Sequence, residues 1–65
     1  MSYNINDIKI GDEVFFHSTT TQNNHDLYWT VTGFTGNRIH INLDKFGIYQ
    51  DWTIDIKDVV AHIPV

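Results

Sequence analysis

Histidine and neighbouring carboxylate side chains are the groups in this chain that could hold a metal ion. His17, His25 and Asp26 lie close together in the sequence, and His40 and His62 follow farther along. A zinc site needs at least three ligands in a fixed geometry. The segment between His17 and His25 is polar throughout and has no apolar residue to hold it in place. We therefore expect four exposed or edge histidines, no cofactor, and only adventitious metal binding.

Catalysis is not indicated by the other polar residues. The chain has no cysteine and no Gly-x-Ser-x-Gly sequence. Its 65 residues also offer little concavity for a substrate. Catalytic carboxylates usually need a burial that raises their pKa, which turn and outward positions do not provide. We expect a protein without enzymatic activity, because such positions are predicted for Asp12, Asp44, Asp51, Asp55 and Asp58.

The aromatic residues give the strongest indication of function. If both tryptophans and the branched residues form a core, several other rings face outwards, and clustered exposed rings mark interaction sites. In the alternative, Phe46 and Tyr49 plug the open end of the domain, because so short a chain must bury most of its apolar groups. The predicted core is Trp29, Val31, Ile39, Ile41, Trp52 and Ile54. The candidate binding residues are Phe15, Tyr28, Phe46 and Tyr49, with Asp26 and Asp51 as charge partners.

The composition predicts an all-β protein. One Ala, two Leu and one Glu stand against nine Ile, five Val, seven Thr and nine aromatic residues. Good helix formers are nearly missing, whereas residues that suit a pleated surface are abundant. Since no disulfide or thiolate zinc site can form, stability must come from packing. The length predicts a single domain over residues 1–65.

Alternating apolar and polar residues, together with turn residues, predict five short strands. A lead-in over Asn4–Ile10 is expected to bury Ile5, Ile8 and Ile10, and a long polar loop over Ser18–Asp26 follows the first strand. A turn over Asp44–Ile48 precedes the fourth strand, and a 3₁₀ turn over Ile56–Asp58 precedes the last. The predicted strands are Glu13–His17, Tyr28–Phe34, Arg38–Leu43, Tyr49–Ile54 and Val59–Ile63.

The central hairpin has two conceivable registers. A two-residue Gly36-Asn37 turn pairs Thr35 with Arg38 and sends the apolar residues of its two strands to opposite faces. An odd loop, with Thr35-Gly36-Asn37 at its tip, instead pairs Val31 with Ile41 and Trp29 with Leu43. We therefore predict a loop of three or five residues, in which Gly36 or Asn37 adopts a positive φ.

This order of elements resembles the SH3-like small barrels, which include Tudor, KOW and bacterial SH3-like domains. The matching segments are Ile8-Lys-Ile-Gly-Asp-Glu-Val14, Tyr28-Trp-Thr-Val-Thr-Gly33 and Asp55-Ile-Lys-Asp-Val-Val60. The glycine-rich turn that follows strand one in KOW motifs is absent. The alternative, an OB-fold, usually needs a longer chain and a helix between strands three and four.

The resemblance implies a five-stranded barrel that acts as a non-catalytic binding module. Tudor-like barrels that read methylated side chains use an aromatic cage with an acid nearby. Tyr28, Phe46 and Tyr49, with Asp26 or Asp51, resemble such a cage, since a cation over aromatic faces is stabilised.

The charge balance argues against nucleic acid as the partner. The net charge is −4, and the basic residues are Lys9, Arg38, Lys45 and Lys57. Binding through phosphate neutralisation needs clustered Lys and Arg. Single-stranded nucleic acid stays as an alternative, because Tyr28, Phe34 and His40 near Arg38 could stack bases. No apolar run suits a membrane span and the N-terminus lacks signal-peptide features, so a cytoplasmic protein is expected.

Self-association is a further expectation. Tyr28, Thr30, Thr32 and Phe34, opposite Arg38, His40 and Asn42, form a face that is neither fully apolar nor strongly charged. Two copies could pack through this face, or pair their edge strands across a two-fold axis. A third alternative is a small acidic subunit that completes a larger assembly.

Overall fold

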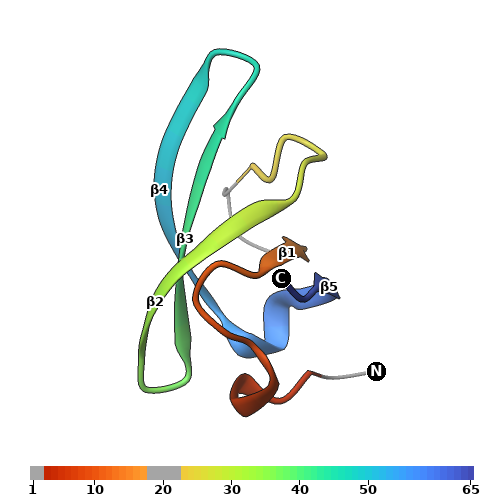
Figure 1. Ribbon diagram of the computed structural model, residues 1–65, viewed down its shortest axis with the longest axis vertical. Coiled ribbons are helices and arrows are strands. Elements are labelled where there is room, and N and C mark those ends of the chain that lie inside the picture. The colour runs from red at the N-terminus through yellow and green to blue at the C-terminus, as the bar shows by residue number, and fades with distance from the viewer. Residues whose placement is uncertain (1–2, 18–22) are drawn as a thin grey trace.

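The computed structural model describes residues 3–17 and 23–65 of the chain. It confirms an all-β protein, with five antiparallel strands and two short 3₁₀ turns (Figure 1). Residues 18–22 of the predicted polar loop lie outside the described residues. The elements in chain order are η1 (Ile5–Asp7), β1 (Glu13–Phe16), β2 (Trp29–Thr35), β3 (Arg38–Lys45), β4 (Ile48–Asp55), η2 (Ile56–Asp58) and β5 (Val59–Ile63).

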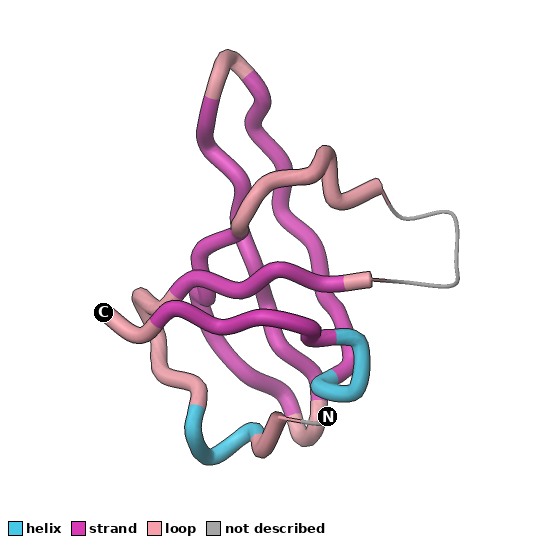
Figure 2. The backbone as a smooth tube through the Cα atoms, turned by 90° about the vertical axis from the view of Figure 1, so that its right-hand side faces the viewer, coloured by secondary structure: helices cyan, strands magenta, loops and turns pink. Residues whose placement is uncertain are grey.

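All five strands belong to one sheet in the order β4-β3-β2-β1-β5. Every pair is antiparallel, and β4 and β5 are the two edges. The pair formed by β1 and β5 runs across the longer strands β2, β3 and β4 (Figure 2). In the described part of the chain, no helix is long and apolar enough to span a membrane.

The core lies on the face of β2 and β3 that β1 and β5 cover. Strict alternation places Val14 and Phe16 of β1, and Trp29 and Val31 of β2, inside. The Phe16 and Trp29 rings meet edge to face, with centroids 5.5 Å apart. The period-2 pattern therefore identified most of the interior correctly. The buried apolar residues are Ile8, Val14, Phe16, Trp29, Val31, Ile39, Ile41, Leu43, Ile54 and Val59.

The predicted odd loop between β2 and β3 is wrong. Thr35 pairs with Arg38, so Gly36 and Asn37 form a two-residue turn, with Gly36 at φ 60°. Val31 nevertheless pairs with Ile41 as predicted, because the register shifts between Val31 and Gly33. A β-bulge adds one residue to one strand of a pair. Here the extra residue is Thr32, and the bulge returns the apolar side chains of both strands to one face.

Two residues that were predicted to be buried are exposed instead. Trp52 pairs with Ile41, yet its side chain is 44% exposed. Alternation places Trp52 on the same face of β4 as Ile54, but that face is covered at Ile54, which is 3% exposed, and only partly covered at Trp52. Ile10 is 66% exposed, because it lies just before the turn at Gly11 and points away from the core that Ile8 enters.

Asp12 lies at a turn, as predicted, but the prediction that its carboxylate is not buried is wrong. Its carboxylate accepts hydrogen bonds from the backbone N–H of Lys9 (2.9 Å), from the backbone N–H of Val65 (3.0 Å) and from His62 Nε2 (2.7 Å). The residue is 3% exposed. Asp12 therefore joins the turn before β1 to β5 and to the C-terminal residue.

These hydrogen bonds favour the charged carboxylate. The His62 hydrogen bond, helped by the Val65 and Lys9 N–H groups, lowers the pKa of Asp12 from 3.8 to about 2. A carboxyl whose pKa is lower in the folded than in the unfolded state stabilises the fold above its unfolded pKa. That contribution is lost as the pH falls from about 4 through about 2.

We expect Asp12→Asn to be less stable than the wild type near neutral pH, with a difference that shrinks as the pH falls through this range. Urea unfolding followed by tryptophan fluorescence between about pH 2 and pH 7 measures this difference. Asp44→Asn, at an exposed position, is the matched control. Parallel stability profiles for the wild type and Asp12→Asn would show that Asp12 does not link folding to pH.

Candidate functional site

Three exposed aromatic side chains lie on the hairpin formed by β3 and β4: Phe46 at its turn, and Tyr49 and Trp52, which alternation places on opposite faces of β4. Phe46 is 85% exposed, Tyr49 is 69% exposed, and Trp52 is 44% exposed. Figure 1 shows this hairpin projecting beyond the rest of the sheet. Phe46, Tyr49 and Trp52 are called the hairpin surface below. Large apolar groups that stay in water on one projecting element mark a contact site more often than isolated ones do.

The turn at the tip of this hairpin holds Phe46 in an unfavourable backbone conformation. Lys45 pairs with Ile48, so Phe46 and Gly47 form a two-residue turn, and their φ values are 54° and 79°. Turns with positive φ at both central residues are the usual two-residue hairpin turns, and they strongly prefer Asn-Gly. A bulky residue at positive φ is strained. Phe46 is thus disfavoured both by its backbone and by its exposed ring.

The residues that flank the turn contact the rest of the protein. Lys45 Nζ lies 3.0 Å from Glu13 Oε2 on β1, and Ile48 packs against the core. Asn42 Nδ2 donates to Asp51 Oδ1 at 2.9 Å. The tip is therefore presented in a defined direction by anchored strands.

The segment before β2 covers the end of the core that lies beside the hairpin. Trp29 Nε1 donates to the Asn24 carbonyl oxygen at 3.0 Å, and Asn24 Nδ2 donates to the Phe16 carbonyl oxygen at 2.7 Å. The His25 ring stacks on Trp29 with centroids 6.3 Å apart, and its Nε2 lies 2.9 Å from Gln50 Oε1. Residues 24 and 25 thus cover the Trp29 end of the core.

The alternative in which Phe46 and Tyr49 plug the domain is wrong, because both side chains are largely in water. The end of the core beside Trp29 is covered by His25 instead. An alternating pattern cannot distinguish these two arrangements, since both leave the same residues on each strand facing inwards.

The predicted binding residues fall into two groups. Phe15 and Tyr28 are half-buried neighbours whose ring centroids lie 5.6 Å apart. Ring contacts in the described residues do not join this pair to Phe46 or Tyr49. Asp26 is exposed before β2, and Asp51 is exposed on β4 beside Asn42. Trp52 was missed as a candidate because alternation assigned it to the core.

The histidines take part in separate hydrogen bonds. His40 lies between Thr35 Oγ1 (2.6 Å from Nε2) and Thr53 Oγ1 (3.1 Å from Nδ1). His62 bonds Asp12, and His25 bonds Gln50. Within residues 3–17 and 23–65, no group of three or more His, Asp or Glu side chains could hold a metal ion.

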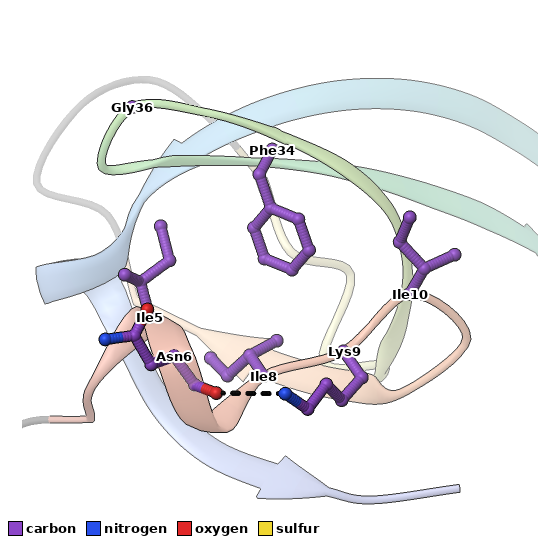
Figure 3. A pocket seen from close by; sticks show the side chains of 7 residues that line it. All are labelled: Ile5, Asn6, Ile8, Lys9, Ile10, Phe34 and Gly36. Carbon is purple, nitrogen blue, oxygen red and sulfur yellow. Dashed lines mark hydrogen bonds between the residues drawn. The ribbon is translucent and has the colours of Figure 1, made fainter.

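The residues considered for base stacking are also separated. Phe34 lines an apolar groove of about 440 Å³ between the N-terminal segment and the β2–β3 turn (Figure 3). His40 has both ring nitrogens within hydrogen-bond distance of threonine hydroxyls, and Arg38 pairs across the sheet with Asp55. The groove is lined by Ile5, Asn6, Ile8, Lys9, Ile10, Phe34 and Gly36.

We expect Phe46→Asn to stabilise the protein by about 1 kcal/mol, because Asn tolerates positive φ far better than a bulky residue does. Urea unfolding measures the change. Tyr49→Thr is the matched control, since it removes an exposed ring from the same hairpin at a position without positive φ. A lower stability for Phe46→Asn would mean that the Phe46 ring contributes to the fold.

The hairpin surface is the feature of this protein that folding explains least well. It combines a strained turn residue with three rings that remain wholly or partly in water. Comparisons with protein-family models, with curated proteins and with solved structures give no match. The indication of function therefore comes from the geometry of the hairpin itself.

Proposed function

We propose that this protein is a non-catalytic binding module of the SH3-like small-barrel type, which binds a protein or peptide through its hairpin surface. The observation that carries the proposal is the exposed Phe46 held at positive φ on a projecting turn. Strained residues that persist in a fold cluster at functional positions. Folding would favour Asn-Gly at this turn, so a role in binding accounts for the ring.

The composition of the hairpin surface supports a protein or peptide partner. Tyrosine, tryptophan and phenylalanine are enriched at the centres of protein interfaces, where they bury a large area with few rotatable bonds. The carboxylates of Asp44 and Asp51 lie on the same hairpin, and the net charge is −4. This charge favours a basic or neutral partner.

The strand arrangement supports the SH3-like part of the proposal. Two consecutive tight hairpins join β2, β3 and β4, and the 3₁₀ turn η2 leads directly into β5 beside β1. The sequence segments that resemble SH3-like barrels lie at the entry to β1, along β2, and from the end of β4 into β5.

The non-catalytic part of the proposal is supported by the role of a buried acid–histidine pair. Asp12 and His62 bond each other, and Asp12 also accepts two backbone N–H groups. These contacts hold chain segments together, so the pair has a structural role that accounts for its burial.

Site-specific photocrosslinking tests the proposal. A photoreactive phenylalanine analogue at position 46 or 49 is expected to form adducts with a distinct protein in an extract of the source cells. An excess of the unmodified protein should abolish these adducts. Phe46→Asn should compete about tenfold less well or worse, which corresponds to a loss of about 1.4 kcal/mol or more of binding free energy.

The matched control carries the same analogue at position 60, because Val60 is 50% exposed on the opposite edge strand β5. Identical adducts from positions 46 and 60, or competition by Phe46→Asn equal to that by the wild type, would contradict the proposal.

A further inference from the structure

Large apolar groups also stay in water at the groove that Phe34 lines. This groove has a volume of about 440 Å³ and lies between the segment before β1 and the β2–β3 turn. Figure 3 shows the Phe34 ring pointing from β2 towards this segment, with Ile5 on one side and Ile10 on the other. Ile8 also lines the groove but is buried, whereas Ile10 and Phe34 are exposed. Binding sites for small molecules have this size and this mainly apolar lining.

The groove lies at the opposite end of β3 from the turn of the hairpin surface. The β2–β3 turn beside the groove precedes β3, whereas the turn at Phe46 follows it, and the eight residues of β3 separate the two. A ligand in the groove therefore leaves the hairpin surface free, so binding there is an activity beyond the proposed function.

Hydrogen bonds hold the N-terminal wall of the groove in place. The backbone N–H of Lys9 donates to Asp12 Oδ2 at 2.9 Å. The backbone N–H of Gly11 donates to the Val31 carbonyl oxygen at 2.9 Å, which ties this wall to the strand that carries Phe34. Both walls are thus positioned before a ligand arrives, and a preformed site lowers the entropic cost of binding.

Lys9 is the charged residue among those that line the groove. Its Nζ donates to the Asn6 carbonyl oxygen at 3.3 Å, and no ion pair joins it to a carboxylate of residues 3–17 and 23–65. An ammonium group has three donors, so donors remain for a ligand. Lys9 is also exposed, which places its charge where the apolar groove meets water. Such a groove complements a molecule that has an apolar body and a negative group.

We propose that this groove binds a small apolar monocarboxylate, with the carboxylate on Lys9 Nζ and the apolar body against Phe34, Ile5 and Ile10. A lysine acts as a compact point charge, so one ammonium balances the single charge of a carboxylate. Binding is favourable because it removes the exposed surfaces of Phe34 and Ile10 from water. The net charge of −4 opposes an anion at long range, so the preference for one must come from Lys9 itself.

Titration followed by NMR shifts of the backbone amides tests the proposal, with decanoate and decylammonium as probes of equal chain length and opposite charge. Decanoate is expected to shift the amides of Ile8, Ile10 and Phe34 with a Kd of about 100 µM or tighter. The amides of Tyr49 and Trp52 should stay unshifted. Decylammonium should bind about tenfold more weakly or worse, although the acidic chain attracts cations.

Two comparisons separate the charged and apolar contributions. Lys9→Gln should weaken decanoate binding about fivefold, as expected for an exposed ion pair. Lys57→Gln is the matched control, because it makes the same change in net charge at an exposed lysine outside the groove lining. Hexanoate should bind the wild type at least about tenfold more weakly than decanoate, since it buries four fewer methylene groups.

Four results would overturn the proposal. The first is the absence of a saturable shift at the groove amides up to about 1 mM decanoate. The second is equal binding of decanoate and decylammonium, which would remove the role of the charge. The third is an equal loss of affinity in Lys9→Gln and Lys57→Gln. The fourth is a shift confined to the amides of the hairpin surface.

Discussion

The β-bulge at Thr32 determines which residues of β2 and β3 face the interior of this protein. The two-residue turn at Gly36 and Asn37 would, by itself, direct the apolar residues of β2 and β3 to opposite faces. The extra residue restores the pairing of Val31 with Ile41, so one continuous apolar face meets β1 and β5. A bulge also bends and twists its strand, which suits a sheet whose β1–β5 part crosses the longer strands. The direction of the β3–β4 hairpin follows from this register.

A second constraint joins the turn before β1 to the C-terminal part of the chain. The fold has no disulfide, and a core of this size is only just sufficient for stability. Asp12 adds stability by accepting three hydrogen bonds. One comes from the nearby Lys9 N–H, and two come from distant groups, His62 and the Val65 N–H. A buried carboxylate is tolerated when its oxygens are hydrogen-bonded in this way. These hydrogen bonds thus join the turn before β1 to β5 and to Val65.

The β3–β4 hairpin, unlike the interior, contains features that do not stabilise the fold. Phe46 has a positive φ and a ring in water, Trp52 is only half covered, and the edge of β4 has no partner strand within the described residues. Each of these features becomes favourable when another chain covers the hairpin. Strand β4 therefore completes the sheet on its β3 side and, within the described residues, leaves its other edge without a partner strand.

The sequence by itself determined the all-β class, the five strands, the 3₁₀ turn before β5 and most of the core, because alternation shows which residues share a face. Alternation does not show how far along a strand that face is covered, so only the tertiary structure showed that Trp52 is partly exposed whereas Ile54 on the same strand is buried. Phe46 and Tyr49 were identified from sequence as candidates, but only the tertiary structure separated them from Phe15 and Tyr28. The hairpin register shows the same limit. An odd loop and an even turn with a bulge give the same facing of side chains, and only packing between distant strands selects one of them.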